Sequence, residues 1–298
     1  MLYYLDVLYK KIPASNIILR IIRYIIRVIS NVYVRYFLKT EYTKNYVQDK
    51  TIIVSLTSYP ARINNLWMVI KTLLAQKEVD NYQIILWLSK IQFPNGLDSL
   101  PYNLRSLTAK GLNISFVDDD LKSHKKYYYA FSQYPENIVV TVDDDVLYSP
   151  FLLKTLFDAH LKFPECVICN RGNVIERNKP YRLWNKAKCF MTPQKDILPT
   201  GIGGVLYPPH CYNQAIFNME AIKSTCINGD DLWLNFMCRL NGNQVVHTGV
   251  MFGFITLLSS QSTALCIENI IHDKNDIQIN AITKWALNNK GTDFYINI

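Results

Sequence analysis

Short apolar runs alternate with amphipathic segments along most of the chain. Four runs rich in β-branched residues, at 52–56, 82–89, 113–117 and 138–142, have the composition of strands that are buried on both faces. Between the first two, apolar residues recur at three- and four-residue steps over 66–74, which predicts an amphipathic helix. Strands that alternate with helices in this way indicate an α/β fold, in which helices flank a mostly parallel, doubly wound sheet.

A wide apolar surface with one polar stripe marks the region 13–38, which is predicted to be a single helix. The stripe consists of Asn16, Arg20, Arg23, Arg27 and Asn31. A membrane-spanning helix would bury three arginines near its middle, at roughly 2.5 kcal/mol or more each. We therefore expect an amphipathic helix on a membrane surface, with its arginines toward anionic headgroups and its isoleucines in the acyl boundary. Packing of this helix on its own domain or on a second subunit is the alternative.

Basic residues are concentrated at the N-terminus. The chain has a formal net charge of +8, and residues 1–50 hold nine basic and three acidic side chains, which leaves +2 for the remainder. The main domain, 46–255, is therefore not expected to bind nucleic acid. The basic module, 1–45, is expected to bind the inner, cytoplasmic face of the cell membrane peripherally. The extension 256–298 has a helical pattern over 277–287 and no assigned role, and 40–50 is a polar linker.

The seven cysteines are scattered along the chain, which suits a reducing compartment. Cys166 and Cys169 form the one close pair. Because no second pair and no histidine lies near them in the sequence, they are predicted to be buried thiols in a strand and not a zinc or redox site.

The strand 138–142 ends in three consecutive aspartates, Asp143, Asp144 and Asp145. Ser149 and Pro150 then suit the N-cap and first residue of a helix. Ligands of open α/β sheets bind at the carboxyl ends of strands, and a hard cation such as Mn²⁺ or Mg²⁺ would relieve the repulsion among three carboxylates. Such a cation keeps positions for the phosphate oxygens of a nucleotide. An aspartate-rich turn that only caps the next helix is the alternative.

The strand, the Asp-x-Asp sequence and the helix after it are similar to the metal-binding motif of nucleotide-sugar-dependent glycosyltransferases of the GT-A fold. Further motifs resemble those of bacterial polysaccharide glycosyltransferases and occur in the same order: VSLTSYPARI, LWLS, KKYYYA, GIGGVLYPP and GDDLWL. The resemblance covers roughly 51–249. It implies a GT-A domain at 46–255 that transfers a sugar from a nucleoside-diphosphate sugar, a UDP-sugar before others. The acceptor would be a glycan on a polyprenyl lipid, in surface polysaccharide synthesis.

The resemblance also implies roles for individual residues. Those implied to contact the donor are Thr57, Ser58, Tyr59, Arg62, Asp119, Lys125, Lys126, Asp143, Asp144, Gly203 and Gly204. Those implied to hold the metal are Asp143, Asp145 and His247. Structural alternatives remain: 57–62 is also a typical strand-to-helix connection, the lysines suit a solvated face, and a lone histidine is often hydrogen-bonded within the protein.

A second acidic pair, Asp230 and Asp231, begins a predicted helix. The pair lies 86 residues beyond Asp145 (231 minus 145), where inverting relatives carry the catalytic base, which favours Asp231 over Asp230. A helix cap is the structural alternative, and a retaining enzyme needs no such base. Two other hypotheses stay open at this stage: a phosphotransferase or nuclease with two cations, and a membrane scaffold that binds nucleotide or glycan without catalysis.

Overall fold

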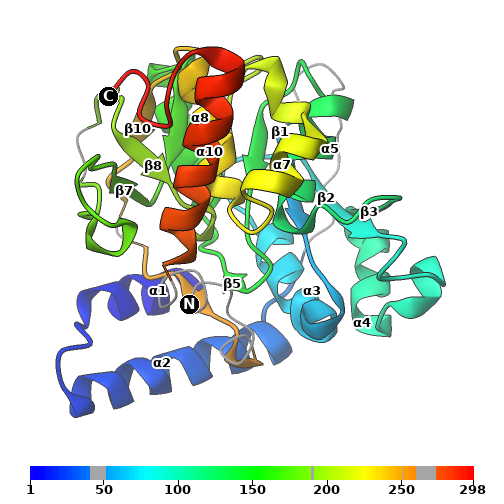
Figure 1. Cartoon of the computed structure of the whole chain (residues 1–298). Coiled ribbons are helices and arrows are strands. Elements are labelled where there is room, and N and C mark those ends of the chain that lie inside the picture. Colours follow the sequence, from blue (N-terminus) through cyan, green and yellow to red (C-terminus); the bar gives the residue numbers. More distant parts are fainter. Residues whose placement is uncertain (41–51, 189–190, 251, 260–272) are drawn as a thin grey trace.

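A seven-stranded, mostly parallel sheet lies at the centre of the computed structural model, which describes residues 1–40, 52–188, 191–250, 252–259 and 273–298 (Figure 1). Within these ranges its strands follow the spatial order β10 (Val245–His247), β6 (Val167–Cys169), β9 (Val205–Tyr207), β4 (Val139–Thr141), β1 (Ile52–Thr57), β2 (Tyr82–Ser89) and β3 (Leu112–Val117). Of these strands only β9 runs antiparallel to its neighbours, β4 and β6. The predicted α/β fold with a mostly parallel sheet is confirmed.

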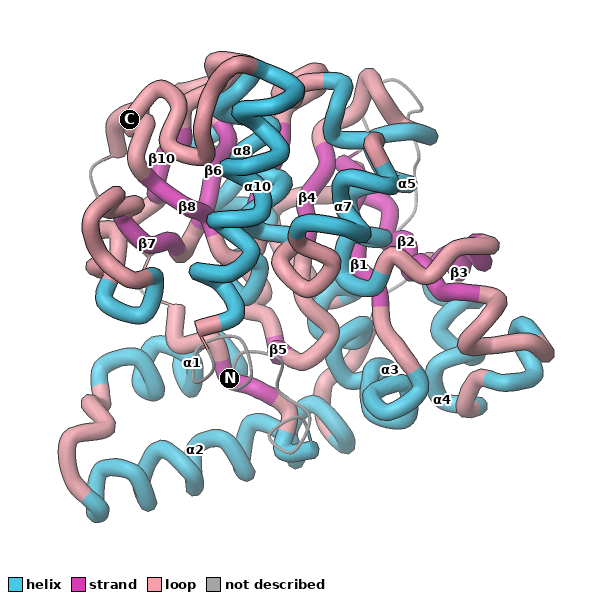
Figure 2. The backbone as a smooth tube through the Cα atoms, in the orientation of Figure 1, coloured by secondary structure: helices cyan, strands magenta, loops and turns pink. Residues whose placement is uncertain are grey.

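Helices cover both faces of the sheet (Figure 2). One face packs on α3 (Pro60–Leu74) and α6 (Leu152–Lys162), and the other packs on α5 (Lys125–Gln133), α8 (Asp230–Leu240) and α10 (Lys274–Lys290). Successive side chains of a strand point to opposite faces, so Val54 of β1 enters the first core and Ile53 enters the second. The shorter elements are α4 (Tyr102–Arg105), α7 (Met219–Thr225) and the antiparallel pair β7 (Gly172–Val174) and β8 (Ile197–Pro199).

The strand order reverses beside β1. The chain runs from β1 to β2 to β3 on one side and then crosses to β4, which pairs with β1 on the other side. A topological switch point of this kind is where ligands bind in open α/β sheets. Ser55 of β1 pairs with Thr141 of β4. The loops that follow these two strands, 58–59 and 142–145, therefore meet at the switch point.

The segment after the three aspartates differs from the sequence prediction. A two-residue strand, β5 (Val146–Leu147), comes first and pairs antiparallel with β11 (Ile255–Thr256). Helix α6 begins at Leu152 and not at Pro150, and Ser149 is not its N-cap, although the Ser149 hydroxyl accepts a hydrogen bond from the Phe151 amide at 3.3 Å. A two-residue strand has no periodicity of its own, which is why the sequence did not reveal it.

Two N-terminal helices, α1 (Leu2–Lys11) and α2 (Ile17–Tyr36), pack together where the sequence predicted one helix (blue in Figure 1). Helix α2 matches the predicted segment, and the Asn16 side chain caps it by accepting a hydrogen bond from the Leu19 amide at 2.9 Å. Arg23 joins the two helices, because its guanidinium donates to the carbonyl oxygens of Tyr9 and Ile12 at 2.6 and 2.7 Å. None of the described helices is long and apolar enough to cross a membrane.

The part of the polar stripe from Arg23 to Asn31 faces the protein, whereas Asn16 and Arg20 are exposed, and this corrects part of the sequence prediction. Arg27 and Asn31 are only 3% and 6% exposed, and both bind the backbone of the segment 256–258. The exposed large apolar residues of α2 are Ile17, Ile18, Ile21, Ile22, Tyr24, Ile25, Ile29, Val32 and Tyr36. The prediction that the arginines point outward is wrong for Arg23 and Arg27, since both bind backbone carbonyls of the protein.

The C-terminal segment belongs to the core of the domain. Helix α10 includes the predicted 277–287 and buries Ile279, Ile282 and Ala286 in the core shared with α8. Cys166 and Cys169 are buried and free, as predicted, and Cys169 closes β6. The predicted linker at 40–50 lies almost wholly outside the described residues.

Candidate active site

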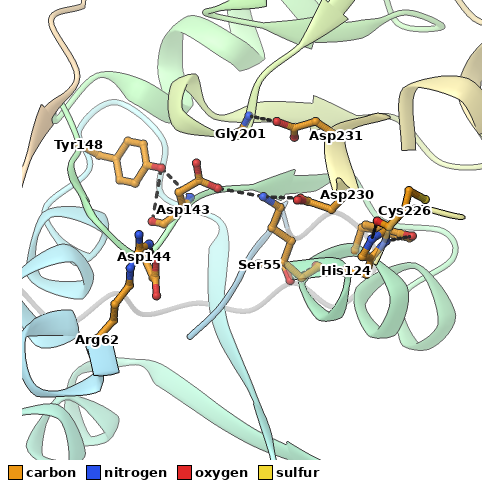
Figure 3. A network of polar contacts seen from close by, with 12 residues as sticks. Ser55, Arg62, His124, Asp143, Asp144, Tyr148, Gly201, Cys226, Asp230 and Asp231 are labelled. Carbon is orange, nitrogen blue, oxygen red and sulfur yellow. Dashed lines mark hydrogen bonds and ion pairs between the residues drawn. The ribbon is translucent and has the colours of Figure 1, made fainter. Parts of the chain in front are cut away.

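The connection from β1 to α3 binds the middle aspartate of the triad. The Ser58 hydroxyl donates to Asp144 Oδ2 at 2.6 Å, and Arg62 in the first turn of α3 donates to Asp144 Oδ1 at 2.5 Å. Figure 3 shows Arg62 beside Asp144. The same guanidinium lies 3.3 Å from Asp145 Oδ2. Asp144 is thereby buried and held between two loops at the switch point. Asp145 shares the Arg62 guanidinium with it, and Asp143 has a different partner, Lys126.

Lys126 at the start of α5 bridges the triad to the helix α8. Its ammonium lies 2.9 Å from Asp143 Oδ1 and 2.7 Å from Asp230 Oδ2 (Figure 3). The Ser55 hydroxyl of β1 donates to the backbone carbonyl of Lys126 and accepts from Trp87 Nε1 at 2.8 Å. This bond fixes the start of α5 against the sheet. Two acidic segments that are far apart in the sequence therefore share one buried cation.

Asp231 lies beside the glycine loop. Its Oδ2 accepts a hydrogen bond from the Gly201 amide at 3.2 Å. A Cβ on Gly201 would come within 2.6 Å of Asp143 Oδ1 and 2.8 Å of Lys126 Nζ. A side chain at position 201 would therefore displace the Asp143 carboxylate or the Lys126 ammonium.

Burial and neighbouring charges shift the pKa values of Lys126, Asp145 and Asp231. Burial lowers the pKa of Lys126, but the negative charges of Asp143, Asp230 and Asp231 outweigh it and raise that pKa well above the ordinary value. Burial, and then the negative charge of Asp143, raises the pKa of Asp145 to about 7. Burial, and then the negative charge of Asp230, raises the pKa of Asp231 to about 7. Two carboxyl groups of the site therefore change protonation near neutral pH.

Asp143 and Asp145 are the carboxylates of the triad that could hold a divalent cation. Their side chains are 31% and 18% exposed, and repulsion from Asp143 helps to raise the pKa of Asp145, which a cation would relieve. Asp144 is engaged by Ser58 and Arg62. Among the described residues no three His, Cys, Asp or Glu side chains gather closely enough to form a complete metal site. Water and donor phosphate oxygens would therefore supply the other ligands, as is usual for Mg²⁺ and Mn²⁺.

No protein family model matches the sequence, and no curated protein matches it. Among solved structures, the mannosyltransferase PcManGT from Pyrobaculum calidifontis in complex with GDP-Man and Mn²⁺ matches with 11% identity and a TM-score of 0.49, over 99% of this chain and 78% of that one. S. aureus TarS 1–349 matches with 13% identity and a TM-score of 0.44, over 82% and 73% of the two chains. A UDP-glucose pyrophosphorylase complexed with UDP-glucose matches with 12% identity and a TM-score of 0.39, over 76% and 97%. At identities this low the likeness concerns the fold alone and does not define a reaction.

Other residues predicted to contact the donor have partners within the protein. The Thr57 hydroxyl donates to the Trp87 carbonyl at 2.7 Å, and the buried Lys125 ammonium pairs with Asp120. The Tyr59 ring lies 5.6 Å from the guanidinium carbon of Arg62. Asp119 lies farther along the sheet edge, 3.9 Å from Lys223 Nζ. Contacts of these residues with a nucleotide stay predictions.

The glycines Gly203 and Gly204 are closely packed by protein atoms. A Cβ on Gly203 would lie 2.8 Å from Arg171 Cβ, and one on Gly204, whose φ is +72°, would lie 2.9 Å from Leu152 Cδ1. His247 closes β10, and its Nδ1 accepts a hydrogen bond from the Gly249 amide at 3.0 Å. The roles of the two glycines beneath a sugar and of His247 toward a metal stay predictions.

Two contributions to the site were not foreseen from the sequence. For Lys126 the sequence suggested a phosphate contact or a solvated face, whereas its ammonium binds both Asp143 and Asp230. The buried Tyr148 hydroxyl accepts a hydrogen bond from the Asp143 amide at 2.7 Å and fixes the start of the triad. The signal for Tyr148 was its position three residues after the triad, next to a strand too short to detect.

The Lys126→Met variant is expected to lose about 3–5 kcal/mol of unfolding free energy at pH 7, because it leaves Asp143 and Asp230 without their shared cation. The matched control is Lys90→Met, which removes an exposed pair with Asp118 and should change stability by no more than about 1 kcal/mol. Urea denaturation of both variants measures the difference. A loss from Lys126→Met as small as that of the control would show that the carboxylates do not depend on this lysine.

Proposed function

We propose that this chain is a metal-dependent, inverting glycosyltransferase that moves a sugar from a nucleoside-diphosphate sugar to a glycan acceptor. One observation carries the proposal: an acidic triad lies at the switch point between β1 and β4, and Lys126 connects it to the buried Asp230, the sequence neighbour of Asp231. The motif order described above supports the same reaction. A donor diphosphate would lie at the exposed side of the triad, with its nucleoside toward the loop after β1.

Different residues would bind the cation, orient the triad and accept the proton of the acceptor. Asp143 and Asp145 would hold the cation, which neutralises the charge that develops on the leaving diphosphate. Ser58 and Arg62 keep Asp144 in place, and so fix the direction of the triad. The acceptor oxygen attacks the anomeric carbon, and the bond from that carbon to the diphosphate oxygen breaks with its electrons leaving on the diphosphate. Asp231 takes the proton of the acceptor hydroxyl.

A pKa of about 7 suits Asp231 to this role. An ordinary aspartate, with a pKa near 3.9, is a weak base, whereas a buried aspartate titrating near neutral pH is stronger and still ionised in a large fraction of molecules. A retaining mechanism is the alternative, because it uses the same fold and metal but no base at this place. The configuration of the product separates the two.

A screen of UDP- and GDP-sugars in the absence of acceptor tests the reaction. With Mn²⁺ or Mg²⁺ we expect the chain to release the nucleoside diphosphate slowly from one donor, and a chelator should stop the release. Failure of every donor would favour a binding scaffold. Release of pyrophosphate from a nucleoside triphosphate and a sugar 1-phosphate would make the chain a nucleotidyltransferase, and two bound cations per site would favour a phosphotransferase.

We also propose that α2 docks on the inner face of the cell membrane, where a polyprenyl-linked acceptor would lie. The exposed isoleucines of α2 are accompanied by exposed basic residues of the same region, Lys10, Lys11, Arg20, Arg35 and Lys39. An apolar face with neighbouring positive charges complements an anionic bilayer. The isoleucines would enter the acyl boundary, as predicted from the sequence. Arg23 and Arg27 would bind the protein and not the lipid headgroups.

The Ile21→Ser and Ile25→Ser double variant is expected to bind vesicles of anionic phospholipid at least about tenfold more weakly, because it removes two side chains from the proposed acyl contact. Ile91→Ser is the matched control, since Ile91 is exposed outside α2. Vesicle co-sedimentation measures the affinity. If the double variant sediments with vesicles as wild type does, and if wild type forms a dimer in solution that the double variant does not form, the exposed face of α2 is a contact with a second copy of the chain.

A further inference from the structure

We propose that Arg27 and Asn31 of α2 are positioning residues for Asp145, which they reach through the backbone of β11. The inference rests on the proposed function in one respect, the role of Asp145 as a metal ligand. It explains why Arg27 and Asn31 of the polar stripe are buried against the protein. It also connects the helix proposed to lie on the membrane with the candidate catalytic edge of the sheet.

The first link joins α2 to β11. Arg27 Nε donates to the Thr256 carbonyl at 3.0 Å, and another nitrogen of the same guanidinium donates to the Leu257 carbonyl. Asn31 Nδ2 donates to the Thr256 carbonyl at 3.3 Å, and Asn31 Oδ1 accepts from the Leu258 amide at 3.2 Å. Two side chains one helical turn apart therefore bind three consecutive backbone residues.

The second link joins β11 to the triad. Thr256 pairs with Val146 and Ile255 pairs with Leu147, in the two residues that directly follow the aspartates. The Leu257 amide donates to the carbonyl of Asp145 at 2.8 Å. Leu257 therefore accepts a bond from Arg27 on one side and donates a bond to Asp145 on the other. In Figure 1 this orange segment lies between the blue helices and β5.

These short strands need outside support. An isolated two-stranded pair is marginal in water even when it is several residues long, and β5 and β11 have two residues each. The bonds from α2 supply part of that support. Without them the Asp145 backbone would lose a fixed partner on one side.

The environment of Arg27 indicates that its role is to hold the backbone of Thr256 and Leu257 in place. In the described part of the chain no carboxylate lies within ion-pair distance of its guanidinium, which is 3% exposed and binds backbone carbonyls. A buried cation without an acidic partner is an expensive way to gain stability. Its forked donors suit two successive carbonyls, which a lysine could not bind together. Burial lowers the pKa of Arg27, and the negative charge of Asp145 acts in the opposite direction.

The experiment uses the full chain with Arg27→Met, Arg27→Lys and the control Arg20→Met. Arg20 lies on the same helix, is exposed and binds only the Ala14 carbonyl among the contacts of the described residues. In the metal-free protein, hydrogen exchange of the Leu257 amide should be at least about tenfold faster in Arg27→Met than in wild type. In the presence of UDP, the Kd for Mn²⁺ should rise about 10–100-fold, as for other groups that orient metal ligands.

The outcomes separate the two proposals. We expect Arg27→Met to keep most of its turnover at saturating Mn²⁺, and Arg27→Lys to regain part of the Mn²⁺ affinity. If Arg27 only stabilised the fold, Arg27→Met would lower the folded fraction and leave the Kd of the folded protein for Mn²⁺ unchanged. Unchanged exchange at Leu257 in folded Arg27→Met, or an unchanged Kd, overturns the inference while the proposed function stands. If Asp145→Ala binds Mn²⁺ as tightly as wild type does, the proposed function and this inference are overturned together.

Discussion

The Asp145→Ala variant is expected to lose metal-dependent donor binding and turnover together. Asp143 and Asp145 are the two carboxylates of the triad that remain partly exposed, at 31% and 18%, so removal of one leaves a cation with a single protein ligand. Turnover should fall to the level seen with a chelator, because the charge on the departing diphosphate is then not neutralised. Titration of Mn²⁺ into the protein with a UDP-sugar, followed by calorimetry and by release of UDP, measures both effects.

The control for this experiment is Asp158→Ala on α6. Asp158 is an exposed carboxylate that pairs with Lys154 four residues earlier and lies outside the proposed site. It should bind Mn²⁺ and turn over like wild type. Mn²⁺-stimulated turnover that persists in Asp145→Ala would remove this aspartate from the reaction and with it the proposed metal site.

The Asp231→Asn variant is expected to bind donor and metal like wild type and to transfer sugar about 10²–10⁴-fold more slowly. Asparagine keeps the size of the side chain and can accept the bond from the Gly201 amide, but it cannot take the acceptor proton. Single-turnover transfer separates this loss from donor binding. An unaffected rate would assign the base to Asp230 or the mechanism to the retaining class.

The pH dependence of transfer gives a second measurement of Asp231. The base must be ionised, and its pKa is raised to about 7 in the ligand-free protein, so below that pH the rate should fall about tenfold for each pH unit. The charge of Asp143 contributes to this raised pKa. A cation at Asp143 would offset that charge and lower the pKa of Asp231, so saturating metal should move the limb of the profile to lower pH. If the acid limb of the pH–rate profile lies at the same pH in Asp231→Asn as in wild type, the group that titrates there is not Asp231.

The positions of the core strands and of most core helices were predictable because each has a local pattern. The runs at 52–56 and 82–89 correspond to β1 and β2, and the helical steps over 66–74 lie within α3. The placement of acidic residues at strand ends was also predictable, since Asp143 directly follows the apolar run 138–142, which contains β4. The strands β5 and β11 were not, because two residues are too few for a period to be recognised.

The direction of a polar side chain was the least predictable property. The stripe on α2 was correctly recognised as one face of a helix, but whether that face meets solvent or protein depends on the segment 256–258, more than 200 residues away in the sequence. Lys126 presents the same problem, because its alternatives were a phosphate or solvent and its actual partners lie on β4's loop and on α8.

The sequence by itself determined the α/β class, the carboxylates at the end of the central strand and the amphipathic helix near the N-terminus, since hydrophobic periodicity reflects local backbone geometry. The tertiary structure alone decided that Lys126 joins the two acidic segments and that Arg27 of α2 binds the backbone of the segment whose Leu257 amide donates to the Asp145 carbonyl. The physical reason is that a buried charge must find its partners in space, and those partners are chosen by chain topology and not by neighbouring residues in the sequence.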